Sequence, residues 1–289
     1  MAEHLVIEIE TNGMIFRGRV AGLDNVSGEP VILLHGFPET SIMWANLMER
    51  LADEGYRRFA PDQRGYSPNA RPEGIKRYIY QELASDVVAL ADELGFRRFH
   101  LIGHDWGSII GWIVLSLYPE RVHSWTAMSV PHIDAFISAI ADDADQQQRS
   151  QYIAFLKSPE QPEETLTNNN LEPLRNLWSP MPEEQVEEYT AVFSQPGALT
   201  AALNWYRANS FGLEQGQQGQ IVGPVSHPTL LIWGNQDIAV GRTSVERTEQ
   251  YMKGPYRLVE LDADHWLIQE EPESTYNEIL AHVKSNRMK

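Results

Sequence analysis

The chain has 289 residues, 42% of them hydrophobic, and its 23 lysines and arginines stand against 40 aspartates and glutamates, a formal net charge of −17. Such an acidic chain argues against binding to nucleic acid or to an anionic membrane surface, and the absence of cysteine excludes disulfides, thiolate metal sites and thiol nucleophiles. No apolar run approaches the ~18 residues of a membrane-spanning helix, and Met1–His4 lacks the basic region of a secretion signal, so we expect a cytoplasmic protein.

The first part of the chain alternates between strand-like and helix-like segments. Leu5–Glu10 and Met14–Val20 alternate apolar and polar residues, which predicts an antiparallel hairpin at a sheet edge. Further strands are predicted at Val31–Leu34, at Arg57–Ala60, in the run that begins at Phe99, and at Trp125–Val130. Helices are predicted between them, at Ser41–Glu54, at Ile79–Leu94 and directly after the strand that begins at Phe99. Strands separated by helices indicate a mostly parallel sheet of α/β type with helices on both faces.

This alternation stops after Pro131. From about His132 to Gly223 the chain is polar and helical, and it closes with the flexible connector Gly216–Gln220. Strands and helices then resume at Thr229–Trp233, Thr243–Met252, Tyr256–Leu261 and Pro272–Ser285. We therefore predict a core domain formed by residues 1–131 and 224–289, with residues 132–223 inserted as a helical cap.

The motif around which the chain is organised is Gly103-His104-Asp105-Trp106-Gly107. It follows an apolar strand and precedes a buried helix, which is the nucleophile elbow of the α/β-hydrolase fold. The two glycines are needed because a Cβ at either place would clash in so tight a turn. The familiar elbow presents a serine, whereas this one presents Asp105. Asp105 could instead simply cap a helix that begins at Ser108, and its partners elsewhere in the chain decide between the two interpretations.

Those partners occur in the order that the fold requires. Asp237 follows the strand Thr229–Trp233, and His265 follows the last predicted strand. Nucleophile, acid and histidine is the chain order of the α/β-hydrolase triad, and sites of open α/β sheets gather at the carboxyl ends of strands. Taken alone, Asp237 reads as a turn residue and His265 as one of nine histidines. Asp134 is the alternative acid.

Two backbone N–H groups are predicted to form an oxyanion hole. They belong to Trp106, which follows the nucleophile, and to Phe37 in the loop after Val31–Leu34. The neighbouring His35 and His104 are predicted to be structural, and the segment Asp62–Ser67 to stabilise its own loop.

Four motifs together resemble the soluble epoxide hydrolases of the α/β-hydrolase superfamily, with the haloalkane dehalogenases as near cousins. The motifs are His35–Glu39, Asp62–Tyr66, Gly103–Gly107 and Asp264–Trp266. The resemblance implies that Asp105 opens an epoxide ring and becomes a covalent ester. A water activated by His265, which Asp237 orients, then hydrolyses the ester and releases a vicinal diol.

The resemblance also implies that two tyrosines of the cap hold and protonate the epoxide oxygen. Leu203–Arg207 is similar to the segment that supplies one of them, Tyr206, and the other is placed at Tyr152. Both tyrosines could instead only pack the cap, as amphipathic aromatic residues often do. Substrate contacts are expected from the aromatic residues Phe37, Trp106, Trp205 and Trp266.

Two other interpretations stay open. A dehalogenase would use the same aspartate but would need N–H donors for a halide, and Trp178 or Trp205 could supply one beside Trp106. Many dehalogenases carry asparagine where this chain has Phe37. A hydrolase-fold protein that only binds a ligand has no need of the triad. No cofactor or metal is expected, and the partners are a small hydrophobic substrate and water, for a monomer or a homodimer.

Overall fold

The computed structural model describes residues 5–209 and 220–288. Within them, one eight-stranded sheet has the order β1-β2-β4-β3-β5-β6-β7-β8. β1 pairs with β2 and β2 with β4 in antiparallel fashion, and every later pair is parallel. The α/β fold with an edge hairpin is thus confirmed. The strands are β1 Leu5–Thr11, β2 Met14–Ala21, β3 Pro30–Leu34, β4 Arg57–Pro61, β5 Phe99–His104, β6 Val122–Met128, β7 Thr229–Gly234 and β8 Tyr256–Leu261.

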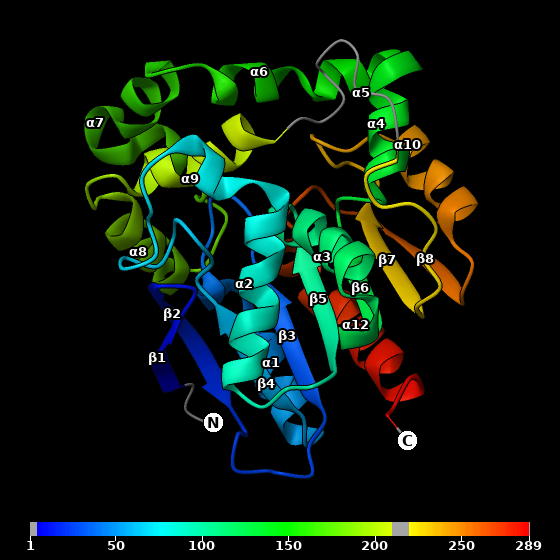
Figure 1. The fold of residues 1–289 in the computed structure, drawn as a ribbon. Coiled ribbons are helices and arrows are strands. Elements are labelled where there is room, and N and C mark those ends of the chain that lie inside the picture. The colour runs from blue at the N-terminus through cyan, green and yellow to red at the C-terminus, as the bar shows by residue number, and fades with distance from the viewer. Residues whose placement is uncertain (1–4, 210–219, 289) are drawn as a thin grey trace.

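Helices cover both faces of the sheet (Figure 1). β3 is buried along its whole length, and because side chains alternate along a strand, it feeds two separate cores. Val31 and Leu33 share one core with residues of α1 and α12, while Ile32 and Leu34 share the other with residues of α2 and α3. These helices are α1 Ala45–Asp53, α2 Tyr80–Glu93, α3 Trp106–Leu117 and α12 Pro272–Ser285.

Helices α4 to α9 follow β6 and precede β7 in the chain. Figure 1 shows α5, α6 and α7 across the top of the view, with α9 and α8 below them on the left, while α4 lies beside α10 (Arg242–Arg247). Of the connector predicted at 216–220, residues 216–219 lie outside the described residues. The helices are α4 Ile133–Asp142, α5 Ala144–Arg149, α6 Gln151–Lys157, α7 Gln161–Leu177, α8 Glu183–Phe193 and α9 Ala198–Ala208.

Several boundaries differ from the predicted ones. β6 ends at Met128 because the chain turns at Ser129, whose φ is +63°. The helix predicted at 243–252 is divided between α10 (Arg242–Arg247) and a 3₁₀ turn, and a 3₁₀ turn likewise precedes α1. The remaining short elements are η1 Ser41–Trp44, η2 Ile75–Tyr78, η3 Pro119–Arg121, η4 Thr248–Tyr251 and α11 Leu267–Glu270. No helix in the described part of the chain is long and apolar enough to span a membrane.

Candidate active site

Asp105 occupies the sharp turn between β5 and α3. Its φ of +51° and ψ of −118° are rare for a residue with a side chain, as expected at a strained elbow. A Cβ on Gly103 would lie 2.3 Å from the Gly107 carbonyl oxygen, and one on Gly107 would lie 2.0 Å from the Leu34 carbonyl oxygen. Both glycines are therefore required, as predicted. α3 begins at Trp106 and not at Ser108. Asp105 is its N-cap residue, but the Asp105 side chain makes no capping hydrogen bond, so the interpretation that the carboxylate serves only to cap the helix is wrong.

The Asp105 carboxylate lies between a backbone donor and an imidazole. Its Oδ1 accepts a hydrogen bond from the Phe37 N–H at 2.8 Å, and its Oδ2 lies 3.6 Å from His265 Nε2. Gly36 permits this approach, because a Cβ there would lie 2.4 Å from the Asp105 Cβ and Oδ1. The N–H of Trp106 follows directly in the chain, at the start of α3.

Asp237 lies on the other side of the same imidazole. Its two carboxylate oxygens are each 3.1 Å from His265 Nδ1, while the N–H groups of Ala239 and Val240 donate to Oδ1 at 2.8 and 3.0 Å. Asp237 itself is fully buried. Nδ1 faces Asp237 and Nε2 faces Asp105, so an Nε2 that carries no proton can accept one from a molecule bound beside Asp105.

The pKa values of this group follow from the paired charges. Burial alone would lower the pKa of His265, but the carboxylates of Asp237 and Asp105 outweigh it and raise the pKa well above its ordinary value. For Asp237, burial raises the pKa, yet the His265 charge and the hydrogen bonds that Asp237 accepts lower it overall. Asp237 is therefore an anion at neutral pH.

Ser129 also contacts this pair, and it could not be predicted from a motif. The residue is fully buried, and its hydroxyl donates to Asp237 Oδ2 at 2.6 Å. The Ser129 hydroxyl oxygen also lies 3.0 Å from His265 Nδ1. A serine just past a strand carries no motif of its own, and only its place at the carboxyl end of β6 could have indicated a role.

Asp134, the alternative acid, has different partners. Its carboxylate accepts hydrogen bonds from the N–H groups of Ile221 and Gly223 at 2.7 and 2.8 Å. It thereby fastens the chain that returns from the inserted helices. The structure places Asp237, and not Asp134, against His265.

Two histidines near the elbow have structural contacts, in line with expectation. His35 Nε2 accepts from the Gln63 N–H at 3.1 Å, and its carbonyl accepts from the Gln63 side chain at 2.7 Å. His104 Nε2 lies 2.9 Å from the His265 carbonyl oxygen, and its Nδ1 lies 3.3 Å from Glu39 Oε2. Glu39 is fully buried and was not singled out from the sequence.

The segment that starts at Asp62 holds its own loop, again as predicted. Asp62 Oδ1 accepts from the Ser41 N–H at 2.9 Å, and the Arg64 guanidinium donates to the two carboxylate oxygens of Asp86 at 2.6 and 2.8 Å. Neither Asp62 nor Arg64 lines the cavity at Asp105.

A cavity of about 320 Å³ opens above Asp105; we call it the main cavity. Its polar side chains are Asp105, His265, Tyr152 and Tyr206, and it contains no lysine or arginine. Such a mostly apolar cavity with a few convergent polar groups is typical of a small-molecule site. The other lining residues are Phe37, Pro38, Leu156, Leu166, Pro173, Leu174, Leu177, Ile238, Ala239 and Trp266.

Both predicted tyrosines reach the main cavity. Tyr206, on α9, is buried, and burial and the Asp105 charge raise its pKa well above the ordinary value, although a hydrogen bond from the Trp106 side chain acts in the opposite direction. Its ring lies edge-on to Phe37, with ring centroids 5.6 Å apart. Tyr152, on α6, is 38% exposed. Its environment still raises the pKa, through desolvation first and then the charges of Asp105 and Asp237.

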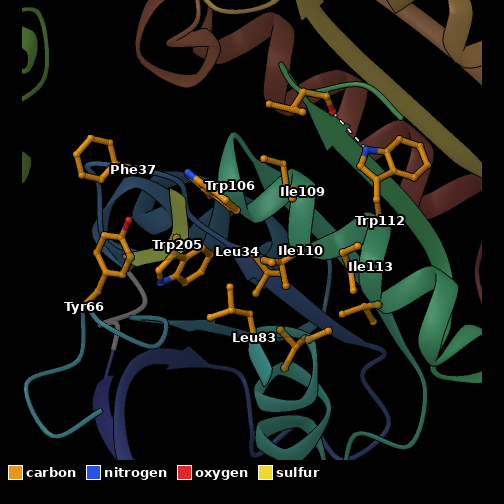
Figure 2. Packing of buried hydrophobic residues seen from close by; sticks show 14 of the residues in the cluster. Leu34, Phe37, Tyr66, Leu83, Trp106, Ile109, Ile110, Trp112, Ile113 and Trp205 are labelled. Carbon is orange, nitrogen blue, oxygen red and sulfur yellow. Dashed lines mark hydrogen bonds between the residues drawn. The ribbon is translucent and has the colours of Figure 1, made fainter. Parts of the chain in front are cut away.

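The predicted tryptophans separate into two groups. Trp266 lines the main cavity, whereas Trp106 lies between Phe37 and Ile109 in Figure 2, with Trp205 beneath it. The expectation that Trp205 contacts substrate needs correction, because its ring packs behind Trp106 with centroids 5.4 Å apart and its N–H donates to the Arg64 carbonyl at 2.8 Å. The N–H of Trp178 likewise donates to a backbone carbonyl, that of Pro38, at 3.2 Å.

No group of three or more potential metal ligands occurs among residues 5–209 and 220–288. The polar groups that line the main cavity are the Asp105 carboxylate, the His265 imidazole, which Asp237 contacts, and the phenols of Tyr152 and Tyr206.

Comparison with known proteins gives the family. The model of the alpha/beta hydrolase fold matches residues 29–272. The AB hydrolase superfamily protein YfhM of Bacillus subtilis (strain 168) is 34% identical over 283 residues, covering 96% of this chain and 97% of the relative. Epoxide hydrolase 4 of Mus musculus is 32% identical over 297 residues, covering 98% and 80%.

A crystal structure of Epoxide Hydrolase A from Mycobacterium thermoresistibile superposes with a TM-score of 0.84 at 27% identity, covering 99% of this chain and 100% of that one. The match therefore extends over the sheet, the inserted helices and the segment that carries His265. The chain belongs to the α/β-hydrolase superfamily, as an epoxide hydrolase-like member.

Proposed function

We propose that this protein hydrolyses an epoxide to a vicinal diol through a covalent ester on Asp105. The observation that carries the proposal is the aspartate at the elbow, with an imidazole–carboxylate pair 3.6 Å away and two tyrosines on the same apolar cavity. The similarity to epoxide hydrolases supports it. A serine esterase mechanism is excluded, because no serine occupies the elbow.

In the first step, an oxygen of Asp105 attacks one ring carbon, and the bond between that carbon and the ring oxygen breaks. Oδ1 is held by the Phe37 N–H, so Oδ2 is the attacking oxygen. The departing ring oxygen is strongly basic and needs an acid, and the phenols of Tyr152 and Tyr206 hold it while one of them gives up its proton. The Tyr206 oxygen accepts from the Trp106 side chain, a bond that uses a lone pair and not the phenol proton.

In the second step, His265 takes a proton from water, and the hydroxide attacks Cγ of the Asp105 ester. The negative charge that develops on Oδ1 is stabilised by the N–H groups of Phe37 and Trp106. The ester C–O bond then breaks, and the hydroxyl proton passes to the leaving oxygen, which completes the diol. His265 gives the proton that it took from water to the tyrosinate, which restores all groups of the site to their starting protonation states.

Helices α6, α7 and α9 supply half of the residues that line the main cavity, among them Tyr152, Leu174 and Tyr206. We therefore also propose that residues 132–223 act as a cap, which completes the cavity and keeps bulk water from the reacting carbons. Residues 1–131 and 224–289 would form the core.

The dehalogenase alternative lacks support at the halide position. A halide leaving group needs N–H donors, yet the indole N–H groups of Trp178 and Trp205 both bond to backbone carbonyls. The Trp106 indole forms a hydrogen bond with Tyr206. An epoxide oxygen, in contrast, is matched by the two phenols.

The deciding experiment is a paired turnover assay, with styrene oxide and diol detection in one arm and a bromoalkane with bromide detection in the other. We expect diol alone; bromide alone would favour the dehalogenase. With His265→Gln, mass spectrometry should show the intact protein heavier by one substrate. Asp105→Ala should show neither turnover nor adduct, and full activity of this variant would refute the nucleophile.

A further inference from the structure

A second, much smaller cavity adjoins the main one; we call it the small chamber. Its volume is about 20 Å³, close to the ~10–15 Å³ that a single water molecule requires. Four residues line both the main cavity and the small chamber, namely Asp105, Tyr152, Tyr206 and Ala239. The shared boundary therefore contains the proposed nucleophile and both proposed acids, so the reacting carbons sit where the two spaces meet.

The small chamber has firm apolar walls. Its other lining residues are all 5% exposed or less, and they are Trp106, Ile109, Val130, Phe136, Ile153 and Val240. The Val130 carbonyl accepts from the Ser108 hydroxyl at 3.1 Å. It also accepts from the Trp112 indole at 3.3 Å, the hydrogen bond drawn as a dashed line at Trp112 in Figure 2. The Val240 carbonyl accepts from the Trp233 indole at 3.2 Å. Because such close-packed walls yield little, this side cannot widen to fit a large group.

The geometry of ring opening makes the difference in size between the two cavities a basis for substrate selectivity. An epoxide that reacts here has Asp105 on one side of the ring and the tyrosine hydroxyls on the other, since attack proceeds from the side opposite the breaking C–O bond. The substituents of the two ring carbons then leave sideways, one set toward each cavity. The main cavity of about 320 Å³ accepts a long apolar group, and the small chamber accepts hydrogen or one methyl group.

We propose that the protein is selective for epoxides that carry one large apolar substituent on one ring carbon and at most a methyl group on the other. This inference rests on the proposed function and names its substrate class. Phe136 sets the limit on the size of the smaller substituent. It is a large apolar side chain in the wall of the small chamber, and because it lies on α4, away from the elbow, it can be replaced without changing the elbow. A butyl group in place of the methyl has no space there without displacing Phe136 or Ile153.

The test compares three isomeric epoxides of decane, which share size and hydrophobicity. One is terminal, one has a methyl group on the second ring carbon, and one has a butyl group on each ring carbon. For the wild-type protein we expect similar kcat/KM values for the first two and a value at least about tenfold lower for the third. Equal values for all three would overturn the selectivity, and diol from none of them would overturn the proposed function instead.

Two variants then locate the limit. Phe136→Ala should raise the kcat/KM ratio of the dibutyl to the terminal isomer by at least about tenfold, and Phe136→Leu should do so less. Leu174→Ala, which enlarges the main cavity by a comparable amount, should leave that ratio near its wild-type value. An equal rise with Leu174→Ala, or no rise with either Phe136 variant when folding is intact by circular dichroism, would show that the small chamber does not set the limit.

Discussion

His265 lies between two carboxylates, with Nδ1 3.1 Å from Asp237 and Nε2 3.6 Å from Asp105. In the resting protein both charges favour the imidazolium ion, which raises the pKa of His265. Esterification of Asp105 removes one of them, so the imidazole loses its proton more easily at the moment when the proposed mechanism needs a base. In the proposed mechanism, the charge of Asp105 thereby controls the basicity of the imidazole that later activates water against the ester.

Asp105→Asn imitates the loss of charge on esterification. Because it removes a negative charge next to Nε2, we expect the pKa of His265 to fall relative to the wild-type protein, measured by NMR titration of the His265 ring. Asp134→Asn removes a buried carboxylate that bonds to the N–H groups of Ile221 and Gly223 and not to His265. This variant should leave the titration of His265 unchanged. An unaltered His265 pKa in Asp105→Asn would contradict this coupling.

The hydroxyl of Ser129 provides a second prediction at this scale. It donates to Asp237 Oδ2 at 2.6 Å, and a hydrogen bond to a charged group is worth about 1.5–3 kcal/mol. In Ser129→Ala we therefore expect the rate of ester hydrolysis to fall by about ten- to a hundredfold, with a smaller effect on ring opening, as separated by single-turnover kinetics. Ser108→Ala is the control, since the hydroxyl of this buried serine donates to the Val130 carbonyl at 3.1 Å and not to Asp237. Equal slowing of both steps in Ser129→Ala would assign the residue to general stability.

The residues that sequence could identify are those held in a motif. Asp105 is framed by glycines, and Asp237 and His265 follow apolar strands in the required order. Trp205 and Tyr206 are consecutive residues of α9, so their side chains point in different directions from the helix axis. The Trp205 ring packs against Trp106, whereas Tyr206 lines the main cavity. Such a difference depends on how α9 is rotated against the sheet, which residue spacing alone leaves open.

At the scale of elements, the junction of β5 and α3 depends on close backbone contact. A Cβ on Gly107 would lie 2.0 Å from the Leu34 carbonyl oxygen, so β3 and α3 would have to separate. We expect Gly107→Ala to lower the unfolding free energy by about 3 kcal/mol, measured by urea denaturation. Gly13→Ala should cost about 1–2 kcal/mol, because its φ of +71° adds strain while no atom lies within 4 Å of the new Cβ. A similar loss in the two variants would mean that strain, and not the contact, determines the cost.

Element boundaries were harder to predict than element types. The apolar run through Val130 predicts a strand up to that residue, but the chain turns at Ser129, which has a positive φ, and β6 ends at Met128. In α7 the residues Asn169, Asn170 and Leu171 all have positive φ, of 44°, 59° and 64°. Asparagine tolerates this conformation, whereas leucine adopts it at a cost, and the Leu171 side chain is buried in the core.

At the scale of the whole molecule, one glutamate ties the inserted helices to the sheet. Glu188, on α8, forms ion pairs with Arg17 and Arg19 of β2 and accepts a hydrogen bond from the Thr40 hydroxyl at 2.6 Å. The Arg19 side chain is 9% exposed and that of Glu188 is 16% exposed. Without the Glu188 carboxylate, the guanidinium groups of Arg17 and Arg19 lose a negative charge that offsets their mutual repulsion.

Glu188→Gln should therefore lower the unfolding free energy by about 3 kcal/mol and accelerate proteolytic cleavage in α7 to α9. The matched control is Glu273→Gln, which breaks an exposed pair with Arg50, with side chains 67% and 41% exposed; such a pair contributes at most about 1 kcal/mol. Both are read by thermal unfolding and limited proteolysis. If the two variants behave alike, the contact between α8 and β2 does not hold the helices in place.

The order of strands and helices along the chain followed from the sequence at this scale, because alternation of the two is visible in apolar periodicity. The contacts of Glu188 did not, since they join residues more than 140 positions apart. A charged residue on a polar helix face resembles its exposed neighbours until the opposing surface is known.

The main cavity contains no lysine or arginine, and the chain as a whole carries a formal charge of −17. An anionic substrate therefore meets repulsion on approach and no countercharge at the wall beyond His265, which is already paired. We expect an epoxide that bears a carboxylate to have a higher KM than its methyl ester, with a difference that shrinks as added salt shortens the screening length. A salt-independent difference would assign the discrimination to desolvation instead. The negative charge of the protein would then disfavour anionic substrates during approach, before the shape of the cavity selects among the neutral ones.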